Sequence, residues 1–528
     1  MEKKYNILFK ILLLFLFSYF FIGTGIHGDD LSYIEKYHNL KLNEFFSFNP
    51  TTKKGNTFFA ISSHFTLFVP YIFFNETNAL IYDLLKIIIT FFCVYFTYFF
   101  LKNYFPKNKS LIAAIIFIFY PTHESTLFWY TSIIHIFAPC CLLYVYALSH
   151  KYNNKLFLIL IIPSTFISYS SPPFLIGLII LSILERKKIE AAYLTLFTGI
   201  YFASYLTFTY YLPEVATRIS DDLSYLEISK NFILKILTTI DTNIGLSFIL
   251  KIYFSLKNNN LFTILIIIVI FCIFLLLSNK RKDKFEKKNS LVYFATSILI
   301  TSIIMMSITG GYFSSPFNLG NRIVFYFSFF LIIILLKYFN AKFFTFFLFL
   351  IVLLPLGGLS NHWKNWNSNQ IEIIKEVSKT NFYKVRSNDI IFLNGPNFSK
   401  LGFINHIEFL AMPWIVEAIF KKNKTLDCLS LLKNQCKIYN LNNHSLIKNG
   451  LYIDKKYQET INVRIENKKI FFYDLQNKTL NTSDKLTIKK KIAMRDRDIR
   501  HWVLTPYFKK ILMNYNDLVP LKIKKYLN

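Results

Sequence analysis

The sequence predicts an all-α polytopic membrane protein with a small α+β domain at its C-terminal end. Apolar runs recur along the first two thirds of the 528-residue chain, near the roughly 20 residues that a helix needs to cross a bilayer. Apolar residues make up 53% of the chain, and the mean hydropathy is +0.37. From residue 360 onward the long apolar runs stop. We therefore expect a transmembrane domain over residues 1–359 and a soluble domain over residues 360–528.

The charge balance is strongly basic, with a formal net charge of +29. In a polytopic membrane protein much of such an excess lies in loops that hold the orientation. The charge is therefore a poor argument for nucleic acid, and we expect membrane lipid rather than nucleic acid as the basic surface's partner. Of the six cysteines, only Cys428 and Cys436 could pair, in an oxidising compartment, and no zinc or haem spacing is present.

The first membrane helix is expected over residues 5–26, uncleaved, with its N-terminus in the cytoplasm because Lys3 and Lys4 stay inside. Two short apolar runs in residues 155–184 predict a tight helical pair that turns on Pro172 and Pro173. About eleven spans result, with the C-terminal domain outside the cell. The other expected spans are 79–100, 110–121, 127–148, 190–211, 261–278, 290–308, 322–338 and 343–358.

Residues 212–258 are ambiguous, because the apolar run within residues 236–256 carries Asp241 and Lys251. If this run spans the membrane, the basic segment 279–288 lies outside, against the tendency of positive charge to stay inside. We therefore predict an outer, partly interfacial segment here.

The C-terminal domain shows alternating apolar residues typical of strands. We expect a helix over residues 360–385, a strand and turn over 389–398, and a hairpin over 460–475 that turns at 466–468. Its excess of Lys and Arg suits an anionic surface or substrate, or is simply a solvated basic face.

Two adjacent carboxylates, Asp29 and Asp30, follow the first apolar run and begin the outer loop over residues 27–78. Carboxylates are costly inside a bilayer, and a neighbouring pair repels unless a proton, a cation or a basic group relieves it. The pair is either a catalytic or metal-binding site or a polar cap where the helix leaves the lipid.

Other polar residues are expected at the same outer boundary. Glu124 and His123 follow Pro121 and precede an aromatic cluster that includes Trp129; the carboxylate could also serve only as a helix-dipole partner. Arg322 suits bidentate binding of a phosphate, or anchors the helix at the interface. His64 lies in an amphipathic stretch, as an interfacial residue or a substrate contact.

These stretches resemble the GT-C glycosyltransferases, which include protein O-mannosyltransferases, aminoarabinose transferases and many bacterial surface-polysaccharide enzymes. The resemblance covers residues 1–360 as architecture, and at motif level it covers GDDLSY (residues 28–33) and HESTLFW (residues 123–129). It implies a sugar donor linked to a polyprenyl phosphate and a glycan or lipid acceptor. It also implies a site on the outer face of the bacterial cytoplasmic membrane.

The resemblance further implies roles for single residues. Asp29 would be the general base, and Asp30 would orient it or bind a divalent cation, Mg²⁺ or Mn²⁺, with Asp29 as a second ligand; many members need no metal. Arg322 would hold the leaving phosphate. Glu124 would position a substrate, and so would His123, His64 and Trp129.

Two rival functions stay open. A flippase or transporter of lipid-linked glycans needs a polar pathway across the bilayer, yet the only charged residues within the clearest expected spans are Asp83 and Lys86. An O-antigen-type polymerase would use a diphosphate-linked oligosaccharide and would favour several outer arginines, of which only Arg218 and Arg322 stand out.

Overall fold

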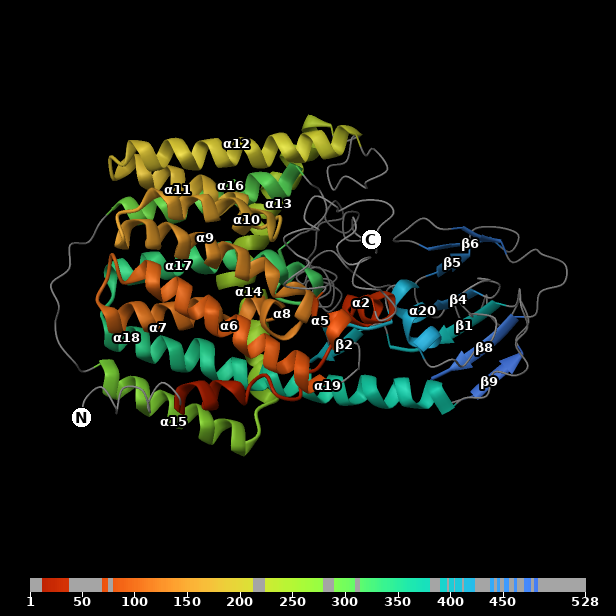
Figure 1. Ribbon diagram of the computed structural model, residues 1–528. Coiled ribbons are helices and arrows are strands. Elements are labelled where there is room, and N and C mark those ends of the chain that lie inside the picture. Colours follow the sequence, from red (N-terminus) through yellow and green to blue (C-terminus); the bar gives the residue numbers. More distant parts are fainter. Residues whose placement is uncertain are drawn as a thin grey trace, which may run out of the picture.

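The protein is a bundle of long helices with a small α+β domain at one end of the bundle, as a computed structural model shows (Figure 1). The bundle is the transmembrane part expected from the sequence, and the α+β part is the expected C-terminal domain. The structure describes residues 12–37, 69–74, 79–211, 224–278, 289–308, 314–379, 390–396, 398–402, 404–410, 413–422, 437–440, 444–446, 451–454, 460–462, 470–475 and 479–482.

Several helices match the expected spans closely. They are α6 (Ala79–Leu101), α7 (Lys107–Ile118), α12 (Lys188–Tyr211), α15 (Leu261–Ser278), α16 (Ser290–Ile308) and α17 (Phe325–Tyr338). The expected tight pair is also present, as α10 (Ile161–Phe166) and α11 (Pro172–Leu184), with a short 3₁₀ helix at Lys155–Leu160 before it.

Five helical stretches among the described residues are long and apolar enough to cross a membrane: Ala79–Leu101, Tyr130–Lys151, Ile228–Lys257, Ser290–Ile308 and Ala341–Val377. Four shorter apolar helices accompany them. On α6 the exposed residues Leu80, Leu84, Ile88 and Phe92 recur every fourth position, which places them on one helix face. A broad exposed apolar face is typical of contact with lipid. The helices are thus consistent with a membrane protein, without fixing the number of spans at eleven.

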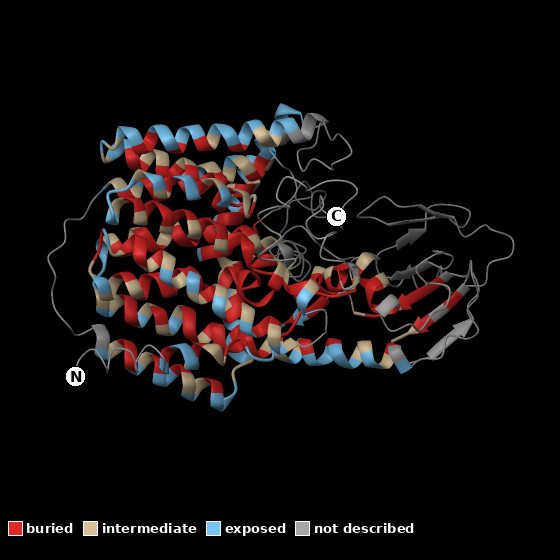
Figure 2. Cartoon of the chain, viewed as in Figure 1, coloured by how far each residue is buried: buried red, intermediate tan, exposed pale blue. Residues whose placement is uncertain are grey.

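Buried residues lie in the middle of the bundle, and exposed ones lie on outlying helices such as α12 and α15 (Figure 2). A single core cluster joins side chains from most of the bundle, including Phe100, Phe294 and Phe329. A second cluster continues into the C-terminal domain through Ile391 and Phe420. The two parts therefore pack against each other.

The first helix ends earlier than expected. Residues 12–18 are helical, and the chain then turns through residues 19–23. Asp83 on α6 accepts hydrogen bonds from the backbone N–H of Gly23 (2.7 Å) and of Gly25 (2.9 Å). In a continuing helix these N–H groups would donate to backbone carbonyls, but here they donate to the Asp83 carboxylate. Asp83 therefore stabilises the turn at which the helix ends.

The span expected at 127–148 is present but begins slightly later, as the helical stretch Tyr130–Lys151. Short turns at Pro121–His123, α8 (Ser125–Phe128) and Tyr130–Ser132 precede the long helix α9 (Ile134–Lys151). A break between these turns falls at Trp129, whose backbone is extended (φ −101°, ψ 114°). The HESTLFW stretch is therefore a compact loop rather than the start of a helix.

Residues 224–257 also differ from the expected interfacial segment. They form α13 (Tyr225–Ile244) and α14 (Leu246–Lys257), which pack against α16 and against α19 (Leu354–Lys379) inside the bundle. Both polar residues that argued against a buried helix find partners. Asp241 accepts a hydrogen bond from the Ser247 N–H in the first turn of α14 (3.1 Å), and Lys251 pairs with Glu124.

The domain boundary expected between residues 359 and 360 falls inside a helix. From α18 (Ala341–Phe347) the chain passes through a π-helical segment at Leu348–Leu353 into α19, which ends at Lys379. The apolar sequence changes to an amphipathic one without any break in the backbone. One helix therefore links the bundle to the C-terminal domain (Figure 1).

The C-terminal domain has a four-stranded sheet in the order β4-β1-β8-β9. The central strand β1 (Ile390–Asn394) confirms the expected strand and is parallel to both β4 (Lys437–Asn440) and β8 (Ile470–Asp474). Strand β9 (Thr479–Thr482) is antiparallel to β8. Helix α20 (Pro413–Lys422) packs against α2 (Asp29–Tyr37) of the N-terminal part.

The hairpin expected over residues 460–475 is wrong. Strands β7 (Thr460–Asn462) and β8 exist, but β7 pairs with β6 (Leu451–Asp454) in a three-stranded sheet that also holds β5 (His444–Leu446). Strand β8 joins the other sheet, because its apolar residues Phe471 and Tyr473 are buried beside β1. A two-stranded ribbon, β2 (Phe398–Leu401) with β3 (Ile404–Glu408), completes the domain.

Candidate functional site

The loop before the acidic pair is held by one buried lysine. Lys86 donates hydrogen bonds to the Gly25 carbonyl (2.6 Å) and to the Phe128 carbonyl (3.1 Å), and it pairs with Asp83 at 2.7 Å. The lysine is fully buried. It thereby ties the loop that precedes the GDDLSY stretch to Phe128 of the HESTLFW stretch.

The two acidic residues occupy different environments at the start of α2. Asp30 is fully buried and accepts hydrogen bonds from the Tyr71 hydroxyl (2.6 Å) and from the Thr131 N–H and hydroxyl (3.0 and 2.8 Å). Its second oxygen accepts the His27 N–H at 3.1 Å. Asp29 is half-buried, and one oxygen accepts the Trp414 indole N–H at 2.6 Å. Asp30 thus stabilises the local fold, whereas Asp29 is the more accessible of the two carboxylates.

These environments do not fit a cation shared by Asp29 and Asp30. Both oxygens of Asp30 are occupied by protein donors. The carboxylate of Asp29 is directed toward Trp414 on α20, away from the side where Tyr71 and Thr131 hold Asp30. Within the described part of the chain, no three His, Cys, Asp or Glu residues are grouped as a metal site would require.

Glu124 lies at the centre of a buried network that joins three parts of the fold. One carboxylate oxygen contacts the Lys251 ammonium (2.7 Å), the Asn321 amide (3.0 Å) and the His406 Nε2 (3.0 Å). Glu124, Lys251 and His406 are all buried. Since His406 belongs to β3, this network ties the C-terminal domain to the loops of the bundle.

The network sets the protonation states of its members. Burial would raise the pKa of Glu124, but the charge of Lys251 and the hydrogen bond from His406 outweigh it and hold this pKa below its usual value. Burial and the charge of Lys251 lower the pKa of His406 to about 4. At neutral pH we therefore infer an ionised Glu124 and a neutral His406, whose Nε2 contacts both the Glu124 carboxylate (3.0 Å) and the Lys251 ammonium (3.3 Å).

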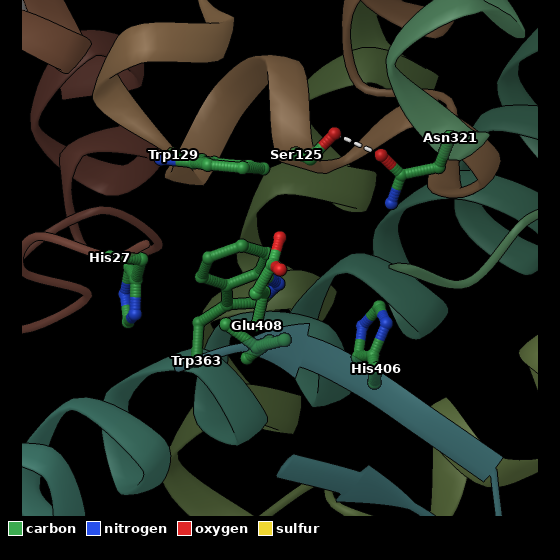
Figure 3. A pocket seen from close by; sticks show the side chains of 8 residues that line it. His27, Ser125, Trp129, Asn321, Trp363, His406 and Glu408 are labelled. Carbon is green, nitrogen blue, oxygen red and sulfur yellow. Dashed lines mark hydrogen bonds between the residues drawn. The ribbon is translucent and has the colours of Figure 1, made fainter. Parts of the chain in front are cut away.

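A small cavity lies where the loops of the bundle meet β3 and α19 (Figure 3). The space between atoms here is roughly 260 Å³ when open solvent is included, and its interior is narrow. Figure 3 shows the rings of Trp129 and Trp363, the His406 imidazole and the Glu408 carboxylate arranged around this space. The lining residues are His27, Ser125, Trp129, Asn321, Trp363, His406, Ile407 and Glu408.

Of the predicted site residues that the structure describes, Trp129 lines this cavity, whereas Asp29, Asp30, His123, Glu124 and Arg322 do not. Close neighbours of some of them do: His27 lies two residues before Asp29, and Ser125 of the HESTLFW stretch follows Glu124. The turn at Asn318–Ile323, which carries Arg322, supplies Asn321. Three segments far apart in the chain thus meet around one cavity.

Arg322 is half-buried beside Trp129, with its guanidinium carbon 5.4 Å from the ring centroid. A cation at this distance from an indole is attracted to the ring. Gly28 also comes close to this ring system, because a Cβ there would lie 2.8 Å from Trp129 Cζ2. Trp129 is therefore the contact that brings Arg322 and the acidic stretch together.

His123 is fully buried, and its ring nitrogens contact the Phe117 carbonyl (3.0 Å) and the Thr126 hydroxyl (3.2 Å). It is not among the cavity-lining residues, so its placement serves the local loop. His64 lies outside the described residues, as do Arg218, Cys428 and Cys436.

Several site residues escaped sequence reasoning. His406 and Glu408 lie in the strand sequence INHIE (residues 404–408), and Trp363 lies in a region noted only for its Trp and Asn content. In the sequence, Lys251 is noticeable only because a charge is unfavourable in a membrane helix. That charge is also the signal that could have identified it as a site residue, because a buried lysine requires a partner of opposite charge.

Comparison of the chain with protein-family models, with curated proteins and with solved structures finds no match. The resemblance to GT-C glycosyltransferases therefore stays a prediction from the residues.

Proposed function

We propose that the protein is a membrane glycosyltransferase of the GT-C type. It moves a sugar from a polyprenyl-phosphate donor to a glycan or lipid acceptor at the outer face of the bacterial cytoplasmic membrane. The observation that supports this most is the meeting of three distant stretches around the cavity beside β3. A transferase needs a base, a phosphate-binding cation and a sugar site close to one bond. The proposed base Asp29 and cation Arg322 do not line the cavity themselves, but they lie two residues from His27 and one residue from Asn321, which do.

Asp29 is the proposed general base. A base must reach the proton of the acceptor hydroxyl within hydrogen-bond distance. Asp29 is half-buried and its orientation is fixed by Trp414. Asp30 is buried, and each of its oxygens is already hydrogen-bonded. Of the two carboxylates, Asp29 is therefore the one that an acceptor can approach.

Arg322 is the proposed group for the donor phosphate. Charge develops on the phosphate oxygen as the glycosidic bond breaks, and a preorganised guanidinium stabilises that charge. The Trp129 ring, 5.4 Å away, supports the guanidinium beside the cavity. Glu124, which the sequence suggested as a substrate contact, instead acts through His406 and Asn321 as a positioning residue.

Turnover of the donor tests this proposal. Purified protein in liposomes is given a panel of polyprenyl-phosphate hexoses and amino sugars with a mixture of glycan and lipid acceptors, and released polyprenyl phosphate is measured by mass spectrometry. We expect release from at least one donor, and we expect Arg322→Lys to lower it because lysine lacks the bidentate fork. No release from any donor would contradict the proposal.

One observation favours a flippase of lipid-linked glycans as a second candidate. A second cavity inside the bundle is lined by apolar residues of α16 and α17 together with the polar residues Lys235, Thr239, Ser302 and Ser314. Buried polar groups within membrane helices often mark a transport path. The same liposomes separate the two functions, since a flippase would move an intact donor between leaflets without releasing polyprenyl phosphate.

A further inference from the structure

Two lysine side chains converge on one aromatic ring at the end of the bundle farthest from the C-terminal domain (Figure 1). Lys102 follows the last residue of α6, and Lys151 is the last residue of α9. Their Nζ atoms lie 3.7 Å and 5.3 Å from the ring centroid of Phe99, which belongs to α6 and is buried. An aromatic ring attracts each ammonium group but neutralises neither charge. We call Lys102 and Lys151 the lysine pair.

The two positive charges of the lysine pair repel each other. Partial burial lowers the pKa of Lys102, and the charges of Lys151 and Lys107 lower it further. Lysine side chains are flexible and strongly hydrated, so two of them that had no reason to meet would extend into water and away from each other. Their shared contact with Phe99 holds them together instead. A negatively charged group beside both would relieve the repulsion and favour their charged forms.

The carboxylates that the structure describes at this end of the bundle are engaged by other side chains. Glu190 pairs with Lys155, and Glu185 pairs with Lys187. Among the described residues, no carboxylate forms an ion pair with either member of the lysine pair. Lys151 is exposed and Lys102 is half-buried, so an anion can reach both from outside the protein.

Helix length places the lysine pair at the level of the lipid headgroups. α6 has 23 residues and is therefore about 35 Å long, slightly more than the roughly 30 Å thickness of the hydrocarbon core. It begins beside the candidate site, where Asp83 and Lys86 hold the loop that precedes the acidic pair. α9 packs along α6 and ends at the same place. The lysine pair therefore reaches the headgroups of the leaflet opposite the candidate site.

The helix surface next to the lysine pair suits acyl chains. On α6, Phe92 and Tyr95 are 49% and 47% exposed. Tyr144 of α9 packs against Tyr95 at 5.8 Å and against Phe96 at 4.3 Å between ring centroids, so the aromatic surface continues from one helix to the other. Tyrosine is enriched where a membrane protein crosses from hydrocarbon to headgroups. A phospholipid with its chains on this surface would carry its phosphate to the lysine pair.

We propose that the lysine pair is a binding site for the phosphate of an anionic phospholipid, whose acyl chains lie against the aromatic surface of α6 and α9. Basic clusters at the ends of membrane helices attract anionic headgroups. A zwitterionic headgroup carries its own cation beside the phosphate, so it would relieve the lysine repulsion less. This site is independent of the proposed function and lies on the other side of the membrane from it.

Native mass spectrometry of the full-length protein in detergent tests the site. The protein is titrated with phosphatidylglycerol, with phosphatidylcholine of the same acyl chains, with farnesyl phosphate and with inorganic phosphate, and the Kd of the tightest-bound molecule of each is measured. Lys151→Gln removes one charge at an exposed position, and Lys151→Arg keeps it. Lys257→Gln is the matched control, because Lys257 is also exposed and lies 4.3 Å from the ring centroid of Tyr253.

We expect Lys151→Gln to raise the Kd of phosphatidylglycerol about fivefold, from about 1 kcal/mol per lysine near an anionic headgroup. Adding Lys102→Gln should raise it further, and Lys151→Arg should leave it near that of the unchanged protein. The Kd of phosphatidylcholine should stay the same in every variant. Lys257→Gln should leave the Kd of both lipids unchanged.

The inference is overturned if Lys151→Gln leaves the Kd of phosphatidylglycerol unchanged, or if Lys257→Gln raises it as much, since the attraction would then belong to surface charge in general. It is also overturned if Lys151→Gln weakens phosphatidylcholine, farnesyl phosphate or inorganic phosphate as much as phosphatidylglycerol. Those results would assign the lysines to any phospholipid, to a prenyl phosphate or to a small anion.

Discussion

The carboxylate of Glu124 and the imidazole of His406 lie 3.0 Å apart, although one comes from a loop of the helix bundle and the other from a strand of the C-terminal domain. Both are buried, and Lys251 joins them at 2.7 Å from the carboxylate. The C-terminal domain is therefore part of the site, and its position depends on a charged network.

Replacing Glu124 by Gln should destabilise the protein strongly. The change leaves the Lys251 ammonium buried without its counter-charge, which costs about 3–5 kcal/mol. Lys251→Met should lose stability for the converse reason, while the double variant should lose less than the two single losses added together. Unfolding of the detergent-purified protein, followed by intrinsic fluorescence, measures all three. Strictly additive losses would show that the pair is not coupled.

Replacing Gly28 by Ala should lower transfer, because the glycine allows close contact with Trp129. Its φ is +52°, and an added Cβ would lie 2.8 Å from the indole. The left-handed backbone alone costs about 1–2 kcal/mol for a residue with a Cβ. We expect at least a tenfold loss of donor turnover. Gly199→Ala is the control, since nothing lies within 4 Å of a Cβ there; equal effects of the two changes would contradict the argument.

Acidification should destabilise the folded protein through His27. Burial and the charge of Lys86 lower the pKa of His27 from 6.5 to about 3. The unfolded chain therefore binds this proton first, and stability that is complete above pH 6.5 is lost as pH falls toward 3. The slope is about 1.4 kcal/mol per pH unit for one proton. Melting temperature against pH should fall less steeply in His27→Gln; identical slopes in both proteins would refute the assignment.

The sequence pointed to the right neighbourhood where polar residues interrupt apolar runs. Asp29, Glu124 and Arg322 stand out because charge at a membrane helix end needs a reason, and residues next to them in the chain, His27, Ser125 and Asn321, line the cavity. The sequence did not indicate that Asp30 is locked by Tyr71 and Thr131, because that depends on contacts between distant segments.

The β3 residues could not be predicted, since INHIE is an ordinary short strand sequence until it is placed against the bundle. The same reason explains the wrong hairpin. β7 and β8 have strand patterns, but pairing is decided by the burial of β8 beside β1, which no local pattern encodes. The sequence predicts a domain boundary at residue 360 because the composition changes there, but helix α19 continues through this position.

The most direct test of the central proposal is the turnover of Asp29→Asn in liposomes, beside Glu35→Gln as a second carboxylate removed from the same helix α2. Loss of a general base should lower the release of polyprenyl phosphate by about 100-fold or more. The melting temperature of Asp29→Asn and the activity of Glu35→Gln should stay near those of the unchanged protein. If Asp29→Asn releases polyprenyl phosphate at the unchanged rate, Asp29 is not the base and the proposed mechanism is wrong.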